Sequence, residues 1–160
     1  MQCVDKNGHR FDVVKFAGDQ YPSLEAMYRS FHPKGKFQGI PPMDDETSRR
    51  WVMGLLERGE NYLSRQDDRT VGHVVILPDH GKKDAEYLIF VSHPYRGKGI
   101  GTRLTDTVLE RANDMGLNTI WLVVGTLNFQ AIGLYKKFGF RFCSHDLHEC
   151  ERKMTLNLVL

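Results

Sequence analysis

The sequence contains little of what marks membrane, secreted or metal-binding proteins. No apolar run approaches the ~18 residues of a membrane-spanning helix, and residues 1–6 lack the apolar segment of a signal peptide. The three cysteines, Cys3, Cys143 and Cys150, are odd in number and have no metal-like spacing. Reduced thiols are the simplest interpretation, with Cys143 and Cys150 facing each other across a hairpin as the alternative. We therefore expect a cytoplasmic location and no bound metal.

An excess of charge of one sign is also absent. The chain has 22 basic and 20 acidic residues, a formal net charge of +2, which gives no reason to expect nucleic acid or a membrane as a partner. We find no internal repeat, low-complexity tract or linker. With 160 residues, 41% hydrophobic and 26% charged, the composition is typical of one globular domain. We expect that domain to span residues 1–160.

A glycine-rich stretch at residues 91–102 is the most informative part of the chain. The apolar run before it, residues 87–91, predicts a buried strand, and apolar residues at three- and four-residue steps predict a helix over 100–115. A strand-to-helix turn leaves backbone N–H groups without partners, and the helix dipole adds positive charge there. Arg96 and Lys98 add whole charges, and the glycines let a ligand approach the backbone. This pattern predicts a phosphate or pyrophosphate site.

The spacing of the glycines separates this stretch from two other phosphate-binding motifs. No part of the chain matches the P-loop G-x-x-x-x-G-K-[ST], and the dinucleotide motif G-x-G-x-x-G is replaced by G-x-G-x-G. The residues match R-x-x-G-x-G, as Arg96-Gly97-Lys98-Gly99-Ile100-Gly101. Placed after a buried strand, this motif resembles the acetyl-CoA-binding motif of the GNAT superfamily of N-acetyltransferases. The plainer interpretation is a tight turn with solvated basic residues.

A second motif supports the resemblance. Residues 128–140 match the N-x-x-A-x-x-L-Y-x-x-x-G-F helix of that superfamily, and they follow a continuous apolar run at residues 119–124, as the family order requires. The two motifs together cover roughly residues 84–142. Two unbroken apolar strands joined by a helix also indicate a parallel βαβ unit that is buried on both faces.

The predicted fold is a single GNAT-like α/β domain. We expect a mixed, mostly antiparallel, twisted sheet of about six to seven strands with a central parallel βαβ pair and about four flanking helices. The expected strands lie at about residues 9–16, 62–66, 71–77, 87–91 and 119–124, with two more at the C-terminal end around Phe140 and Met154. The expected helices lie at about residues 19–31, 44–56, 100–115 and 128–138.

The resemblance implies how acetyl-CoA would be bound. Its pyrophosphate would lie on the amides from about Gly97 to Thr102, with Arg96 and Lys98 nearby, and Asn128 would contact the pantetheine arm. A simple helix cap is an equally good interpretation of Asn128. The implied cofactor residues are Val91, His93, Arg96, Gly97, Lys98, Gly99, Ile100, Gly101, Thr102, Asn128 and Tyr135.

The resemblance also implies catalytic roles. The backbone N–H of Val91, with Phe90 as the alternative, would stabilise the oxyanion of acetyl transfer. Tyr135 resembles the general acid of the family, since a phenol of pKa ~10 can protonate a thiolate of pKa ~8.5. The plainer interpretation of Tyr135 is a core residue.

The general base is less well marked in the sequence. Glu86 lies early on the same strand, and a glutamate in a buried strand is costly to bury without a reason. The alternative is a solvated edge residue. His93 and His73 could each act through water, but a hydrogen-bonded structural role is the favoured interpretation of both.

The leading hypothesis is direct acetyl transfer from acetyl-CoA to a primary amine in a ternary complex. Neither motif contains a cysteine, so an acetyl-cysteine intermediate has no support. The alternatives are a non-catalytic CoA-binding sensor or assembly module, against which Tyr135 and Glu86 argue, and another nucleotide-binding α/β protein. We expect acetyl-CoA and an amine acceptor as partners, no nucleic acid and no membrane, and leave a homodimer open.

The acceptor itself is not indicated by the sequence. Its choice would depend on the loop of residues 32–42, the first two helices and the C-terminal hairpin. Basic residues in this region, such as Arg29 and Lys36, and acidic residues at 44–46 point in opposite directions.

Overall fold

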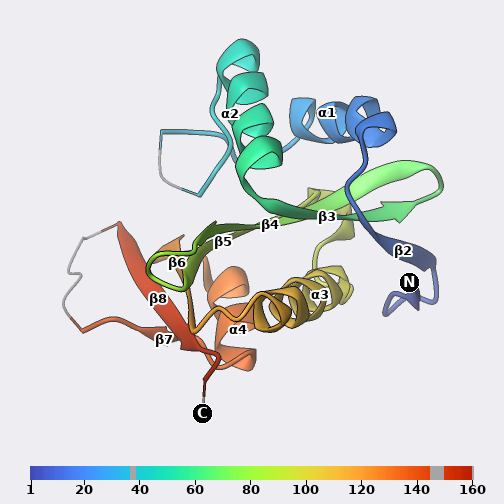
Figure 1. Cartoon of the computed structure of the whole chain (residues 1–160). Coiled ribbons are helices and arrows are strands. Elements are labelled where there is room, and N and C mark those ends of the chain that lie inside the picture. The colour runs from blue at the N-terminus through green and yellow to red at the C-terminus, as the bar shows by residue number, and fades with distance from the viewer. Residues whose placement is uncertain (37–38, 145–149, 160) are drawn as a thin grey trace.

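One twisted sheet organises the chain in the computed structural model, which describes residues 1–36, 39–144 and 150–159 (Figure 1). The strand order is β1-β2-β3-β4-β5-β6-β8-β7, and the neighbours are antiparallel except for the parallel pair β5–β6. This pair is the predicted βαβ unit. The strands are β1 Gln2–Val4, β2 Arg10–Lys15, β3 Glu60–Gln66, β4 Arg69–Asp79, β5 Asp84–Val91, β6 Thr119–Gly125, β7 Arg141–Phe142 and β8 Glu151–Asn157.

Helices cover both faces of the sheet. Helices α1 (Tyr21–Arg29) and α2 (Asp45–Arg58) lie on one face, and α3 (Ile100–Asp114) and α4 (Phe129–Lys137) lie on the other (Figure 1). Short 3-10 turns, Gly18–Gln20 and His93–Tyr95, precede α1 and the glycine turn. The predicted α/β architecture with four helices is therefore confirmed.

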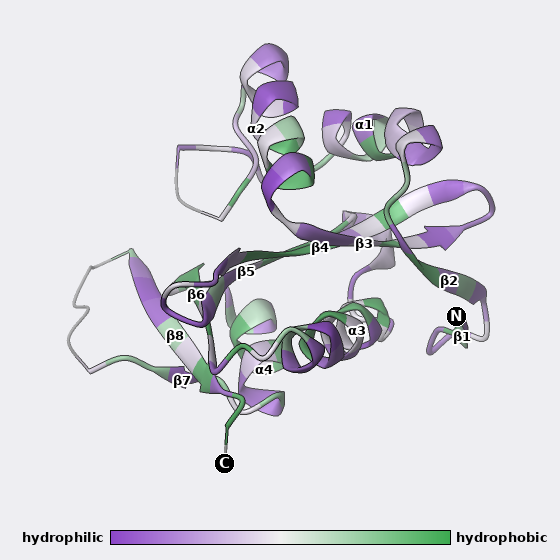
Figure 2. Cartoon of the chain, viewed as in Figure 1, coloured by the Kyte–Doolittle hydropathy of each residue, from purple (hydrophilic) through white to green (hydrophobic). Residues whose placement is uncertain are grey.

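Each face of the sheet buries its own apolar core. Along β5, Ala85 and Tyr87 pack with α3 and α4, whereas Leu88 and Phe90 pack with α1 and α2. This alternation follows from the period of two along a strand that is covered on both faces. The apolar residues of the helices turn towards the sheet (Figure 2).

The number of strands differs from the prediction of six to seven. The described residues form eight strands, and the additional strand is β1, whose three residues pair with residues 10–12 of β2. Three residues are too few to show an apolar alternation, so this strand had no sequence pattern. Residues 37–38 of the predicted acceptor loop and 145–149 of the C-terminal hairpin lie outside the described residues.

Polar side chains begin two of the helices, and glycines follow the ends of two. The Asp44 carboxylate accepts a hydrogen bond from the Thr47 amide at 2.7 Å, and the Asn128 Oδ1 accepts one from the Ala131 amide at 3.2 Å. Gly116 and Gly139 follow α3 and α4 with φ of +69° and +93°, a left-handed conformation in which glycine carries no steric penalty. The capping role of Asn128 is thus present in the fold.

Candidate active site

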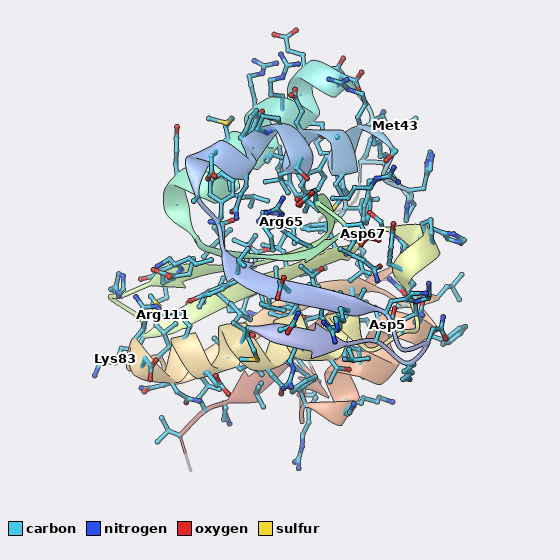
Figure 3. The ribbon with its side chains drawn as sticks, turned by 90° about the vertical axis from the view of Figure 1, so that its right-hand side faces the viewer. Asp5, Met43, Arg65, Asp67, Lys83 and Arg111 are labelled. Atoms are coloured by element: carbon cyan, nitrogen blue, oxygen red, sulfur yellow. The ribbon has the colours of Figure 1, made fainter. Side chains whose placement is uncertain are left out.

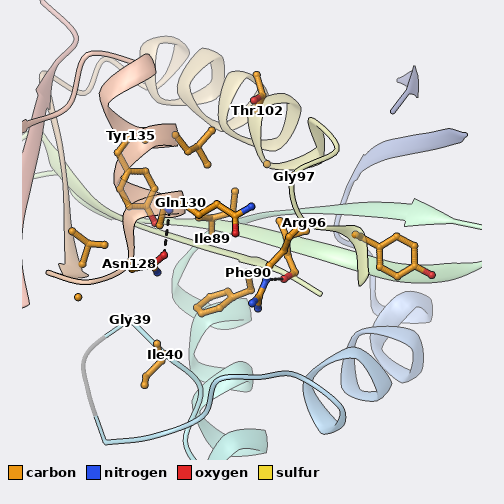
Figure 4. A pocket seen from close by; sticks show the side chains of 18 of the residues that line it. Gly39, Ile40, Ile89, Phe90, Arg96, Gly97, Thr102, Asn128, Gln130 and Tyr135 are labelled. Carbon is orange, nitrogen blue, oxygen red and sulfur yellow. Dashed lines mark hydrogen bonds between the residues drawn. The ribbon is translucent and has the colours of Figure 1, made fainter. Parts of the chain in front are cut away.

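A cavity of about 400 Å³ lies where the parallel strands separate (Figure 4). Strands β5 and β6 pair over residues 84–86 and 119–121, and beyond these residues both strands contribute to the cavity wall. The remaining walls come from the glycine turn, α4, the segment after α1 and Lys6 in the turn between β1 and β2. The predicted site residues that line it are Val91, Arg96, Gly97, Gly99, Gly101, Thr102, Asn128 and Tyr135.

The glycine turn exposes its backbone to this cavity. Gly97 and Gly99 have φ of +74° and +93°, a conformation that other residues rarely adopt, and Gly99 is the N-cap of α3. A Cβ atom on Gly99 would meet no atom within 4 Å, so the space beside the turn is open. The first amides of a helix have no intrahelical acceptors, and here they border the cavity. An anion fits this arrangement of N–H groups.

The backbone N–H of Val91 faces the separation between β5 and β6. The Ser92 amide donates to the Val71 carbonyl of the neighbouring segment at 2.9 Å, and hydrogen-bonded pairs alternate along an antiparallel ladder. Val91, which is paired with Gly72, is therefore a non-hydrogen-bonded partner, and its N–H and carbonyl turn away from β4. The Phe90 amide, one residue earlier, turns towards β4 instead.

Arg96 reaches over the end of β5. Its Nε donates to the Val91 carbonyl at 2.7 Å, its Nη2 donates to the His32 carbonyl, and its guanidinium lies 5.2 Å from the centre of the Phe31 ring. Burial lowers the pKa of Arg96 from its usual value. Arg96 thus ties the segment after α1 to the end of β5, and part of its hydrogen-bonding capacity is used within the protein.

Tyr135 enters the cavity from α4 (Figure 4). Its ring is 7% exposed and meets the Tyr87 ring edge to face at a centroid distance of 5.7 Å. Burial raises the pKa of the Tyr135 phenol well above its usual value. The phenol is therefore protonated at neutral pH and can act as a hydrogen-bond donor or an acid.

Glu86 lies outside this cavity. It is half-buried on the face of β5 that packs against α1 and α2, and it borders a groove of about 750 Å³ together with Trp51 and Leu77. The groove and the cavity share two wall residues, Gly39 and Ile40. Tyr135 and Glu86 therefore belong to two hollows that meet at these residues.

Three other predicted residues do not line the cavity. His93 is exposed in the 3-10 turn, Ile100 is buried in the core, and the Lys98 ammonium lies 5.5 Å from the centre of the Tyr95 ring. His73 is fully buried, with its ring nitrogens 2.6 Å from the Tyr28 hydroxyl and 2.8 Å from Asn61 Oδ1. Burial lowers the pKa of His73 to about 3, which fits the structural interpretation of this residue.

Two cations in the cavity wall were missed by the sequence analysis. Lys137 lies at a variable position of the second motif, with its ammonium 3.5 Å from the Thr102 hydroxyl. Lys6 comes from the turn between β1 and β2, and its amide donates to the Lys98 carbonyl at 2.9 Å. No sequence pattern connects Lys6 with a turn more than ninety residues away, because the strand pairing of β1 brings the two together.

The comparison with family models identifies the domain. The acetyltransferase (GNAT) family matches residues 22–140. This chain belongs to that family. Acetyl-CoA-dependent N-acetylation is the general kind of reaction of the family, with acetyl-CoA as co-substrate.

Curated proteins similar to this chain include N-acetyltransferases. The chain is 33% identical to N-acetyltransferase family 8 member 2 of Rattus norvegicus over 57% of this chain and 42% of that protein. It is 32% identical to the uncharacterized N-acetyltransferase YvbK of Bacillus subtilis over 63% of this chain and 65% of that protein. The matched region thus spans about half the length of these relatives.

Solved structures share the fold at low sequence identity. The GNAT domain of S. lividans PAT has a TM-score of 0.81 at 14% identity, over 99% of this chain and 96% of that one. The acetyltransferase yncA of Salmonella typhimurium, solved with its cofactor acetyl-CoA, has a TM-score of 0.73 at 14% identity, over 92% and 94%.

The described residues form neither a metal-binding cluster nor a membrane-spanning helix. Within residues 1–36, 39–144 and 150–159, no cluster of three His, Cys, Asp or Glu side chains could hold a metal ion. None of the helices in this part of the chain has the length and apolar character needed to cross a membrane. The three cysteines are free thiols.

Proposed function

We propose that the protein transfers the acetyl group of acetyl-CoA to a primary amine by direct attack in a ternary complex. The observation that carries the proposal is the Val91 N–H, which faces the separation between β5 and β6 in the cavity that also holds Tyr135. A donor for the developing oxyanion and an acid for the leaving thiolate therefore border one space. The glycine turn would hold the phosphates at the other end of this cavity.

The backbone of Val91 has the geometry of an oxyanion donor. Its position is set by the β4–β5 ladder, so the N–H needs no rearrangement when negative charge develops on the thioester oxygen. Arg96 holds the carbonyl of the same residue at 2.7 Å and so fixes the end of the strand. Of the two predicted donors, this favours Val91, because the Phe90 amide faces β4.

Tyr135 is proposed as the acid. The raised pKa keeps its proton in place at neutral pH, while the thiolate that leaves the acetyl group has a pKa of ~8.5 and accepts a hydrogen bond or a proton. Asn128 uses its Oδ1 to cap α4, so its Nδ2 is the atom proposed to contact the pantetheine arm.

Glu86 is proposed to receive the proton of the acceptor ammonium through water. An ammonium of pKa ~10 must lose a proton before it attacks. Glu86 lies in the groove that meets the cavity at Gly39 and Ile40, so an amine that approaches along the groove passes this carboxylate before it reaches the thioester.

The binding step is tested by calorimetric titration with acetyl-CoA. A Cβ on Gly101 would lie 3.3 Å from Leu134 Cδ2 and 3.7 Å from Ile89 Cδ1, so Gly101→Trp displaces these side chains and places an indole in the cavity. A melting curve checks that this variant is folded. Gly18→Trp is the matched control, because its Cβ would meet no atom within 4 Å and it lies outside the cavity. We expect one-to-one binding by the wild type and the control and none by Gly101→Trp. A folded wild-type protein that does not bind would overturn the proposal.

The chemical step is tested with Tyr135→Phe on a panel of amines. We expect kcat to fall by about 100-fold with the Kd of acetyl-CoA within about twofold, since general-acid catalysis contributes about 10²–10⁴-fold. Tyr87→Phe is the control, because Tyr87 packs against the same ring but does not line the cavity. Binding of acetyl-CoA without turnover of any amine would instead support the non-catalytic CoA-binding module.

A further inference from the structure

The turn between β1 and β2, residues 5–9, packs against the glycine turn. The Lys6 amide donates to the Lys98 carbonyl at 2.9 Å, and Lys6 is one of the residues that line the cavity. The two turns come from opposite parts of the sequence, and this hydrogen bond joins them at the beginning of α3. A segment outside the two family motifs is therefore part of the cavity wall.

The turn is built rigidly around the Asp5 carboxylate (Figure 3). Asp5 Oδ1 accepts hydrogen bonds from the Asn7 amide at 2.8 Å and the His9 amide at 3.0 Å, and the Gly8 amide donates to the Asp5 carbonyl at 3.0 Å. Burial alone would raise the pKa of Asp5, but the hydrogen bonds from His9 and Asn7 outweigh it and hold the pKa below its usual value. With each amide from 5 to 9 donating a bond, Lys6 is held beside the cavity before any ligand binds.

The charges along the cavity wall favour a polyanion. The described lining residues include three cations, Lys6, Arg96 and Lys137, and no carboxylate. Arg96 is engaged with the carbonyls of Val91 and His32. Arg96 keeps further N–H donors beyond these two bonds. Lys6 from the β1–β2 turn and Lys137 from α4 add two more cations beside the glycine turn.

We infer that the β1–β2 turn is part of the acetyl-CoA site and that the Lys6 ammonium binds a phosphate group of CoA. This inference rests on the proposed function. The Lys6 backbone is already bonded to the glycine turn, so its side chain adds charge to the amides of that turn at little cost in ordering. The Lys6 ammonium thereby favours binding of acetyl donors that carry phosphate, in addition to the main-chain N–H groups of residues 97–102.

The test is a charge series at position 6 with acetyl-CoA as the titrant. We expect Lys6→Gln to weaken Kd by about fivefold to tenfold and Lys6→Arg to stay within about twofold of wild type, because a charge-assisted contact at a partly exposed site has this size. Arg10→Gln is the matched control, since it removes one positive charge at the start of β2 without lining the cavity. Its Kd should also stay within about twofold.

Salt provides a second readout. Raising NaCl from about 50 mM to about 500 mM should shrink the difference between the wild type and Lys6→Gln, because an ionic contact is screened and a packing contact is not. Equal Kd values for the wild type and Lys6→Gln, or an equal loss in Lys6→Arg, would overturn this inference alone. A wild-type protein that binds no acetyl-CoA would overturn the proposed function as well, so the two failures are distinguishable. Melting temperatures of the variants exclude a loss of fold.

Discussion

The two faces of the sheet carry different kinds of structural feature: exposed main-chain N–H groups on one face and a cluster of aromatic side chains on the other. On the face of α3 and α4, the glycine turn presents main-chain N–H groups, whose placement needs glycine at particular positions. On the face of α1 and α2, aromatic side chains from distant segments meet around Phe90, among them Tyr28, Trp51 and His73. Main-chain recognition depends on a short motif, whereas side-chain packing can be achieved by many combinations of residues. A sequence motif therefore predicts the glycine turn, whereas no motif predicts the aromatic cluster.

Each face also buries a series of hydrogen-bonded polar side chains, and the two series differ in their partners. The Asn61 amide Nδ2 donates to the carbonyls of Leu55 and Gly59, so its Oδ1 accepts from His73 Nε2, and His73 Nδ1 accepts from the Tyr28 hydroxyl. On the other face, the Tyr87 hydroxyl lies 2.8 Å from Thr105 Oγ1, which itself donates to the Gly101 carbonyl at 2.6 Å. In the first series, the hydrogen bonds of the His73 ring join it to side chains alone, whereas in the second series Thr105 has a backbone partner.

The largest expected effect compares the two tyrosines. Tyr28→Phe leaves the Nδ1 of a fully buried His73 without a donor, which should lower the free energy of unfolding by about 1–3 kcal/mol. Tyr87→Phe should cost about 1 kcal/mol or less, because Thr105 keeps its bond to Gly101. Urea unfolding of both variants measures the difference. Equal losses would show that the two series are equivalent.

The two faces should also differ in how their stability depends on pH, because among the described residues only the α1/α2 face buries a histidine, His73. Burial lowers the pKa of His73 from its usual 6.5 to about 3 in the folded protein. Below pH 6.5 the His73 ring is therefore protonated in the unfolded chain but stays neutral in the folded protein. The free energy of unfolding is therefore unaffected by this group above pH 6.5, and below pH 6.5 it falls by up to about 1.4 kcal/mol per pH unit. Urea unfolding at pH 7.5 and 5.5 should show this loss in the wild type and in the exposed control His80→Gln. A loss of the same size in His73→Gln would contradict the assignment.

The smallest expected effect concerns the helix caps of the two faces. Asn128→Ala should cost about 1 kcal/mol, the usual cost of losing such a cap, and also weaken acetyl-CoA binding. Asp44→Ala should lower the melting temperature through loss of the bond to the Thr47 amide, yet leave the Kd of acetyl-CoA unchanged because Asp44 does not line the cavity. Melting curves and calorimetry separate the two outcomes. Similar losses of acetyl-CoA affinity in both variants would contradict the division of roles.

Much of the fold followed from local patterns. The apolar run at residues 87–91 and the helical spacing after Ile100 each reflect a buried face, so they predicted β5 and α3 directly. The short strand β1 could not be predicted, because three residues pair only through their long-range partner β2. At the site, the glycine motif indicated the turn that we propose binds an anion. The separate locations of Glu86 and Tyr135 depend on which face of a strand or helix each residue occupies in the folded chain.

The sequence by itself determined the glycine turn, the βαβ unit around it and the family to which the chain belongs, because backbone geometry restricts the residues that each of these features accepts. Tertiary structure alone decided which of the Val91 and Phe90 amides faces the separated strands. It alone decided that Arg96 is bonded to carbonyls of β5 and the segment after α1, and that Lys6 lies in the cavity wall. These three facts depend on strand register and on contacts between segments far apart in the chain, which no local spacing of residues encodes.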